Sequence, residues 1–373
     1  MKRSVILLTA LISIALFTQA GAIDYSRVVF HDIPDDLIEK QLGKMPPSRL
    51  TRLDSLNLAS YRFTGDTLKV MVILVKWYDR QPMYPGAMFD SAFLSRDVYP
   101  GGSIADYYDE VSYGQVTVVG DVIDWRYYGF YTGWVDFESI LNELDGTVDF
   151  SQYDGDQDGN VDAAVFVRAG NGQEDSGDPN DIWSYAITFA PGDGLGPYDG
   201  VLVPALCTVP ETMPLRDPDN PTVFLPGQKT FNRISVAAHE LAHDMGLPDL
   251  YDYDNKLDVA TYTTPNDNND HPFVDWCLMG YGGYGIMALG KIVPTHLSGW
   301  CKKEIGWITP IALEETEYQD LVINNIETTN DSSLYKIPID PAEEEYFLLE
   351  YRNPRSTGRF DKIDSDFSVY LWP

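Results

Sequence analysis

Two histidines and a glutamate stand at a spacing that could bind and use a metal ion, in His239-Glu240-Leu241-Ala242-His243. Because residues four apart lie on the same face of an α-helix, both imidazoles could reach a single ion. Glu240 lies beside them, where it could accept a proton from a water molecule on that ion. The chain has only five histidines, so an amphipathic helix that carries this pattern by chance is the weaker explanation.

A zinc site of this kind needs a third protein ligand and leaves one position for water. The chain continues as DMGLPD over 244–249, and a sharp turn at Gly246 would bring Asp249 back toward the ion. We therefore expect Asp249 to be the third ligand. Asp252 and Glu304 are competing carboxylates, and Asp249 could alternatively only stabilise the turn that follows the proline.

A methionine lies in a glycine-bearing turn downstream, in WCLMGYGG over 276–283. In zinc peptidases of the metzincin type, a methionine turn lies beneath the metal site. Met279 is therefore expected to form the floor of the site, although a methionine before a glycine often only packs. Tyr281 could donate a hydrogen bond to the oxyanion that develops on a cleaved carbonyl, with a packing role as a nearly equal alternative.

A second group of carboxylates follows the pattern of a calcium loop, in DGDQDGNVD over 154–162. Acidic side chains alternate along it and a glycine occupies the sixth position, as hard cations require. The twelfth position is Val165 rather than a bidentate glutamate, so the loop is not a complete EF-hand. We expect a structural calcium ion here, against the alternative of a solvated turn, with these ligands: Asp154, Asp156, Asp158, Asn160 and Asp162.

These groups must be positioned by a core, and apolar periodicity indicates its elements. A buried strand is expected over 68–77, a further strand over 116–122 and a short apolar strand-like run over 161–168. Helices are expected over 103–111, 231–245 and 297–305, the second ending at Gly246 with Pro248 beyond it. The regions 186–228 and 252–272 are rich in turn-forming or polar residues and are expected to form surface loops. After about residue 312 the pattern changes to strands, in LVINNIE, SLYKIPI, EYFLLEY and FSVYL.

The N-terminus has the features of a secretory signal over residues 1–22. Lys2 and Arg3 precede an apolar stretch over 5–17, and Ala20-Gly21-Ala22 forms a cleavage site. An uncleaved anchor is the alternative. No later segment supplies about 18 uninterrupted apolar residues, so we expect a secreted or extracytoplasmic protein with no stable membrane insertion after signal cleavage.

Export places the three cysteines in an oxidising compartment. Cys207, Cys277 and Cys301 could form one disulfide and leave one thiol. Their spacing does not identify the pair.

The charge balance excludes some partners. The 373 residues include 57 acidic and 26 basic side chains, a formal charge of −31. A chain this negative repels phosphate backbones and anionic lipid surfaces, so nucleic acid is not an expected partner. The apolar share of 44% is enough for a sizeable core.

The quoted motifs resemble a known family, the immune inhibitor A-like secreted metallopeptidases. The resemblance lies in HELAHDMGLPDLYD and DWCLMGYGG, and in further segments over 102–120, 153–162, 177–186 and 296–307. It implies an α+β fold with a metzincin-like zinc-peptidase domain, in which a twisted sheet and an active-site helix flank a cleft for an extended peptide. It also implies that His239, His243 and Asp249 bind zinc, that Glu240 is the general base and that Met279 is the floor. The wider metzincin pattern has histidine at the position of Asp249.

The expected organisation has four parts: the signal peptide, a segment over 23–66, a catalytic domain over 67–312 and a β-rich segment over 313–373. Residues 23–66 could be a propeptide, a wrapping arm or a lead-in. The chain stops at Trp372-Pro373, directly after a strand-like run, which suggests that the β-rich segment is incomplete.

The function expected from these residues is that of a secreted zinc endopeptidase acting on protein or peptide substrates. Glu240 would accept the proton of a metal-activated water and pass it to the leaving amine. Two alternatives stay open: a catalytically inactive, calcium-stabilised adhesion or binding protein, and a zinc hydrolase that acts on a non-peptide bond.

Overall fold

The computed structural model describes residues 28–31, 61–217, 220–250, 276–280, 282, 286–288, 291–313, 321–339, 346–353, 360 and 368–372. The predictions for the signal peptide, for the loop over 252–272 and for Asp252 and Tyr281 lie outside these residues. No helix within them is long and apolar enough to cross a membrane.

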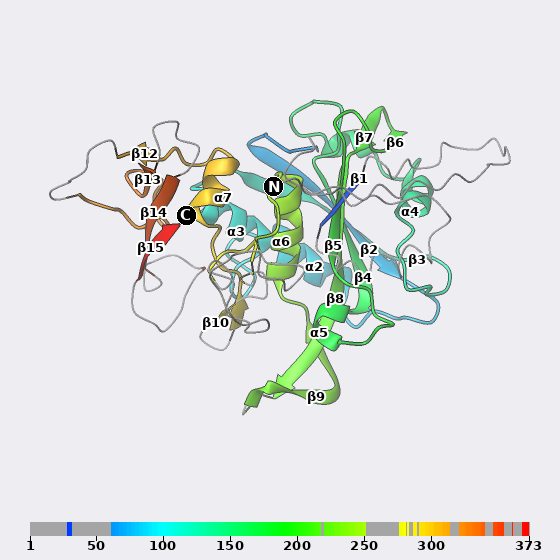
Figure 1. The fold of residues 1–373 in the computed structure, drawn as a ribbon. Coiled ribbons are helices and arrows are strands. Elements are labelled where there is room, and N and C mark those ends of the chain that lie inside the picture. Colours follow the sequence, from blue (N-terminus) through cyan, green and yellow to red (C-terminus); the bar gives the residue numbers. More distant parts are fainter. Residues whose placement is uncertain are drawn as a thin grey trace, which may run out of the picture.

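A seven-stranded mixed sheet forms the centre of the molecule (Figure 1). Its order is β1-β5-β8-β4-β2-β3, and β9 also pairs with β8. The pairs among β3, β2, β4 and β8 are parallel, whereas β1, β5 and β9 join antiparallel. Its strands are β1 (Val28–His31), β2 (Thr67–Lys76), β3 (Thr117–Tyr127), β4 (Ala163–Asn171), β5 (Tyr185–Phe189), β8 (Ala205–Asp217) and β9 (Asn220–Phe231).

Strand β2 shows why the sheet is buried on both faces. Its sequence TLKVMVILVK is nearly continuous in apolar residues, as expected for a parallel strand covered on two sides. Val70 and Val72 pack into one apolar core, and Met71 and Ile73 pack into the other. The strands expected over 68–77, 116–122 and 161–168 are thus confirmed as β2, β3 and β4.

Helices cover both faces of the sheet. On one face pack α2 (Gly86–Leu94), α3 (Ile104–Val111) and α6 (Ile234–Asp244), and on the other pack α4 (Phe137–Leu144) and the short 3-10 helix η2 (Phe150–Tyr153). A capping box starts α3, since the Ser103 hydroxyl and the Asp106 carboxylate each accept the other residue's backbone N–H. The helices expected over 103–111 and 231–245 are therefore confirmed as α3 and α6.

The prediction of surface loops over 186–228 is wrong. This region contains β5, most of β9, all of β8, and the hairpin of β6 (Leu195–Tyr198) and β7 (Val201–Val203). The prolines and glycines that suggested loops fall at irregular points of the pairing, and the register of β8 shifts against β9 between Pro214 and Arg216. Apolar burial in β8, where Leu206 and Cys207 face opposite cores, outweighs the turn composition.

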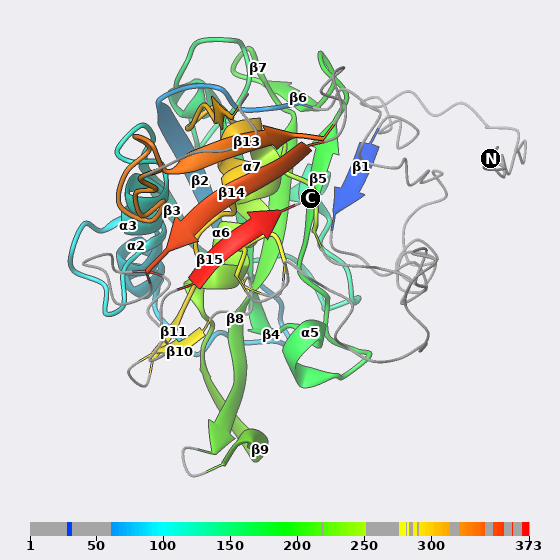
Figure 2. The same ribbon diagram turned by 60° about the vertical axis from the view of Figure 1, so that its left-hand side comes forward.

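A smaller four-stranded sheet lies beyond α7 (Gly299–Glu304), on the side of α3 and α6 away from the main sheet (Figures 1 and 2). It has the order β12 (Ile311–Ala312), β13 (Leu334–Pro338), β14 (Tyr346–Arg352) and β15 (Ser368–Trp372). The helix expected over 297–305 is confirmed as α7, and three of the four expected C-terminal strands form. The prediction of a strand over 321–327 (LVINNIE) is wrong, because this segment contains only an isolated bridge from Asn325 to Tyr351.

Two remaining elements belong to neither sheet: the short helix α5 (Gln173–Ser176) and the hairpin of β10 (Ile286–Ala288) and β11 (Lys291–Val293). Strand β1 comes from the N-terminal segment over 23–66 and pairs with β5 at the edge of the main sheet, with Val28 opposite Phe189 and His31 opposite Ala186. That segment therefore supplies one strand to the sheet.

Candidate metal centre

The helix α6 presents both histidines from within the protein. All of its residues are buried, and Gly246 follows it with a φ of +84°, a conformation that side chains disfavour. The N–H of Gly246 donates to the carbonyl of His243, and the N–H of Leu247 donates to that of Ala242. The chain therefore reverses at once and passes back along the end of the helix.

Each histidine ring is oriented by a backbone carbonyl. Nδ1 of His239 lies 2.6 Å from the carbonyl oxygen of Leu278, and Nδ1 of His243 lies 2.7 Å from that of Leu247. A carbonyl can only accept, so both Nδ1 atoms carry the proton. In the neutral rings, Nε2 then presents its lone pair, which is the arrangement that metal-binding histidines have in proteins.

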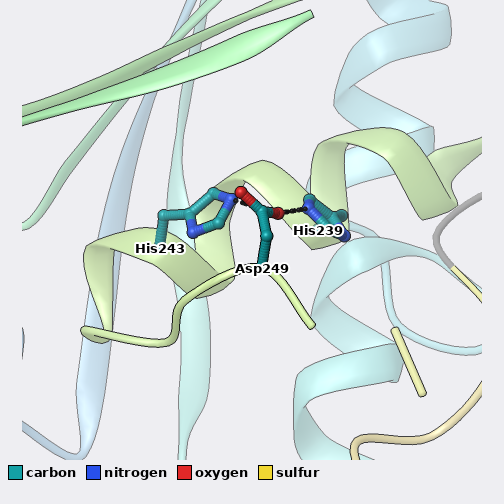
Figure 3. A group of neighbouring side chains, drawn as sticks. All are labelled: His239, His243 and Asp249. Atoms are coloured by element: carbon teal, nitrogen blue, oxygen red, sulfur yellow. Dashed lines mark hydrogen bonds and ion pairs between the residues drawn. The ribbon is translucent and has the colours of Figure 1, made fainter. Parts of the chain in front are cut away.

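Asp249 lies between the two rings (Figure 3). Its Oδ1 is 3.0 Å from Nε2 of His239 and 3.5 Å from Nε2 of His243. The turn at Gly246 brings this carboxylate back to the helix face, as the sequence analysis expected. The three side chains form one of two clusters, among the described residues, whose ligand atoms all lie within 4.8 Å of one another.

The donor set of this cluster favours a cation. Two imidazole lone pairs and a carboxylate point at one place, and acceptors that converge in a buried site repel each other unless a proton or a metal ion lies between them. The Asp249 side chain is only 2% exposed and that of His243 is fully buried. The residues therefore fit zinc, which takes nitrogen and carboxylate ligands in tetrahedral sites.

Met279 lies next to this cluster, in a turn that is tied to both ligand segments. The N–H of Gly280 donates to the carbonyl of Cys277 and closes the turn. The carbonyl of Leu278 orients His239, and the carbonyl of Met279 accepts the N–H of Leu250, directly after Asp249. Met279 itself is fully buried. The structure thus places the expected floor residue beside the cluster.

Glu240 lies on α6 and is buried, at 2% exposure. The Glu240 carboxylate interacts electrostatically with Arg168 on β4 and with Cys207 on β8, and raises the pKa of both groups. Burial lowers the pKa of Arg168, and the carboxylates of Glu174 and Glu240 partly oppose this. A cationic group of the sheet therefore lies within electrostatic range of the expected base.

Two other carboxylates do not join the cluster. Glu304, at the end of α7, forms an ion pair with Lys303 instead. Asp244 follows His243 on the helix, so its side chain points away, and burial raises its pKa well above the usual range. Among the described residues, Asp249 is therefore the carboxylate that meets both histidines.

The loop over 154–162 forms the second cluster of ligand atoms, made by Asp154, Asp156 and Asp162. Asp162 is fully buried and accepts the N–H groups of Lys69 on β2 and of Gly155. Gly155 is required by the close packing here, since a Cβ would lie 2.5 Å from Asp162 Oδ2 and 2.7 Å from the Thr67 carbonyl oxygen.

The other two expected calcium ligands, Asp158 and Asn160, lie in the same loop, and the Asp158 carboxylate is not among the three that form the cluster. Asp158 Oδ1 accepts the N–H of Asn160, and Asn160 forms a bridge with Leu202. Burial raises the pKa of Asp162 to about 7, with Asp156 and Asp154 adding to the effect against two N–H donors that lower it. The buried carboxylate therefore favours a proton or another cation.

Sequence reasoning missed Arg352, which connects the small sheet to the turn that contains Met279. From β14, its guanidinium donates to the carbonyls of Trp276 and Leu297 and to Glu350. Glu350 in turn accepts the N–H of Gly299, the first residue of α7. These contacts fix the start of the methionine turn. No local pattern marks the residue, because Trp276 lies 76 positions away in the chain.

Replacing Arg352 with methionine should destabilise the protein by about 3–5 kcal/mol, because Glu350 is fully buried and would lose its cation. Thermal or urea unfolding measures this. Arg96→Met is the matched control: Arg96 forms a half-exposed pair with Asp109, and its loss should change stability by less than about 1 kcal/mol. Equal effects of the two substitutions would contradict the role given to Arg352.

Comparisons with known proteins relate part of the chain to a metalloprotease. No model of a known protein family matches it. It is similar to the pre-pro-metalloprotease PrtV of two Vibrio cholerae serotype O1 strains, M66-2 and ATCC 39315 / El Tor Inaba N16961. Identity is 29% over 145 residues, which cover 34% of this chain and only 14% of each relative. A partial relationship to a metalloprotease is therefore shown.

Proposed function

We propose that the protein is a secreted zinc-dependent endopeptidase. The observation that carries the proposal is the convergence of Nε2 of His239, Nε2 of His243 and the Asp249 carboxylate on one point, with both Nδ1 atoms engaged elsewhere. The partial similarity to a metalloprotease supports it. Zinc held by these three residues would polarise the scissile carbonyl and lower the pKa of a water molecule to about 7.

The chain's own groups then have distinct roles. Glu240, one residue from His239, accepts the proton of the attacking water at its carboxylate and passes it to the leaving amine. The carbonyls of Leu278 and Leu247 keep both rings in the tautomer that binds metal. In this proposal, Met279 forms the floor of the metal site, and Tyr281 donates a hydrogen bond to the oxyanion that develops on the scissile carbonyl.

We further propose that the main sheet and α6 form a metzincin-like catalytic domain of the immune inhibitor A-like type. The motif HExxHxxGxxD over 239–249 supports this, since it keeps the metzincin spacing and changes only the third ligand from histidine to aspartate. Proteins or peptides would be the substrates.

The test is metal analysis and proteolysis on the purified mature chain. We expect one zinc per chain, and cleavage of a denatured protein such as reduced casein that stops after chelation and returns with added zinc. Zinc without cleavage in the full mature chain would favour a latent form held by residues 23–66 or a hydrolase of a non-peptide bond. A folded chain that binds no zinc would favour a calcium-stabilised binding protein instead.

We also propose a structural calcium ion in the loop over 154–162. The three carboxylates that converge there supply hard oxygen ligands. Asp158 and Asn160 would complete the shell through a carboxylate and a backbone carbonyl. The ion would hold the loop between η2 and β4.

Calcium should raise the melting temperature strongly at pH 7.5 and little at pH 5. Without the ion, the pKa of Asp162 is about 7, above its unfolded value. The folded state therefore binds more protons than the unfolded state between about pH 4 and 7, and Asp162 destabilises the ion-free protein as the pH rises. Calcium needs the ionised carboxylate, so its benefit appears over the same range.

Thermal unfolding with calcium, and with magnesium at equal concentration, measures this effect. Asp156→Asn should abolish most of the calcium-induced shift, and Asp109→Asn, at an exposed pair with Arg96, should leave it unchanged. A shift that is equal at both pH values, or equal in the two variants, would argue against the site.

A further inference from the structure

Two cysteine side chains meet beneath the metal centre. Sγ of Cys277 lies 3.7 Å from Sγ of Cys301, and both residues are fully buried. Cys277 begins the turn that contains Met279, and Cys301 lies on α7. Ser298 lies between them: its N–H donates to the sulfur of Cys277 and its hydroxyl accepts the N–H of Cys301. The third cysteine, Cys207, lies on β8 in the main sheet.

We propose that Cys277 and Cys301 form a disulfide in the exported protein, and that this bond fixes the turn beneath the metal centre. A bond of about 2.05 Å requires the two sulfurs to approach from their present separation of 3.7 Å. The spacing of the cysteines left the pair open, whereas the fold brings these two together.

The bond would form by thiol–disulfide exchange with a small disulfide or a disulfide-bearing oxidoreductase as the exported chain folds, before both side chains are buried. The Cys277 thiolate attacks the oxidant's disulfide and expels one thiol, and the Cys301 sulfur, losing its proton, then displaces the second. The two cysteines lose two electrons and two protons, and the oxidant becomes two thiols.

In the folded protein, hydrogen bonds distinguish the two thiols. Burial by itself would raise the pKa of Cys277, but hydrogen bonds from the Cys301 thiol and from Ser298 outweigh it and lower the pKa to about 6. Burial raises the pKa of Cys301, which keeps its proton. The two sulfurs are therefore already in contact, as closure of a disulfide requires.

The position of the bond links it to the orientation of His239 in the proposed metal site. Leu278, next to Cys277, donates its N–H to the carbonyl of His296 and orients His239 through its own carbonyl. The cysteines are 24 positions apart, so the bond closes a loop that contains the β10–β11 hairpin. Closing such a loop restricts the unfolded chain and stabilises the turn. The disulfide rests on export, whereas its effect on metal binding rests on the proposed function.

Thiol counting tests the bond directly. The full mature chain, purified from the extracytoplasmic fraction, is alkylated with iodoacetamide under denaturing conditions, before and after reduction, and mapped by mass spectrometry. We expect one labelled thiol, Cys207, before reduction and three after it. Refolding of the reduced, denatured protein with oxidised glutathione should restore the same pattern. Three labelled thiols in both exported and glutathione-treated protein, or a bond that includes Cys207, would overturn the proposal.

Cysteine variants test the effect of the bond on stability and on zinc binding. Cys277→Ala/Cys301→Ala and reduction of the wild type should each lower the melting temperature by about 5–10 °C, and should weaken zinc binding in chelator competition. Cys207→Ala is the matched control, because it should keep the bond, with no thiol labelled before reduction. A chain with the bond but no zinc would refute the proposed function alone, and a zinc enzyme without the bond would refute this inference alone.

Discussion

Replacing Glu240 with glutamine is expected to lower kcat/KM for peptide hydrolysis by about 10²–10⁴-fold, the contribution of a general base. The amide keeps the size of the side chain but cannot take the proton of the attacking water. His239, His243 and Asp249 are untouched, so zinc should stay at one per chain. Steady-state kinetics on a quenched fluorescent peptide, with metal analysis of the same sample, measures both quantities.

The same substitution at Glu304 provides the control. Glu304 was a competing ligand on sequence grounds, but the structure pairs it with Lys303 at the end of α7. Glu304→Gln should therefore keep both zinc and activity. Ordinary turnover by Glu240→Gln would refute the mechanism. Loss of zinc in Glu240→Gln would instead mean that the carboxylate helps to build the site, and not only to transfer a proton.

The grouping of His239, His243 and Asp249 was largely predictable because its signals are local. The spacing of His239 and His243 places both rings on one helix face, and Gly246 marks where the helix must end. Asp249 lies only six positions beyond His243, within the reach of a single turn. Short-range geometry therefore determines these positions, whatever the rest of the chain does.

The groups that hold the cluster were not predictable, because they come from distant parts of the chain. The carbonyl that orients His239 belongs to Leu278, 39 positions away, and the guanidinium that fixes that turn belongs to Arg352. Neither residue stands in a pattern that marks its partner. Strands β8 and β9 were missed for a related reason: their prolines indicate turns locally, while pairing and burial in the sheet decide the outcome.

Replacing Asp249 with asparagine is expected to weaken zinc binding by about 100-fold or more, and activity should fall with zinc occupancy. The substitution removes the negative charge between the two Nε2 atoms and offers an amide, a poor zinc ligand, in its place. Chelator competition gives the affinity. The zinc-induced rise in melting temperature is a second readout, and it should disappear in the variant while the ion-free protein still unfolds cooperatively.

Two further variants make this assignment decisive. Asp252→Asn removes the competing carboxylate and should leave zinc affinity unchanged. If Asp252→Asn instead loses zinc affinity while Asp249→Asn keeps it, Asp252 is the third ligand. Asp249→His replaces the proposed ligand with another residue that can bind zinc, the one that metzincins have at that position. Because Gly246 already turns the backbone toward the two rings, the histidine variant should bind zinc more tightly than the asparagine variant. Equal loss of zinc in both variants would mean that Asp249 maintains the turn rather than binding the metal.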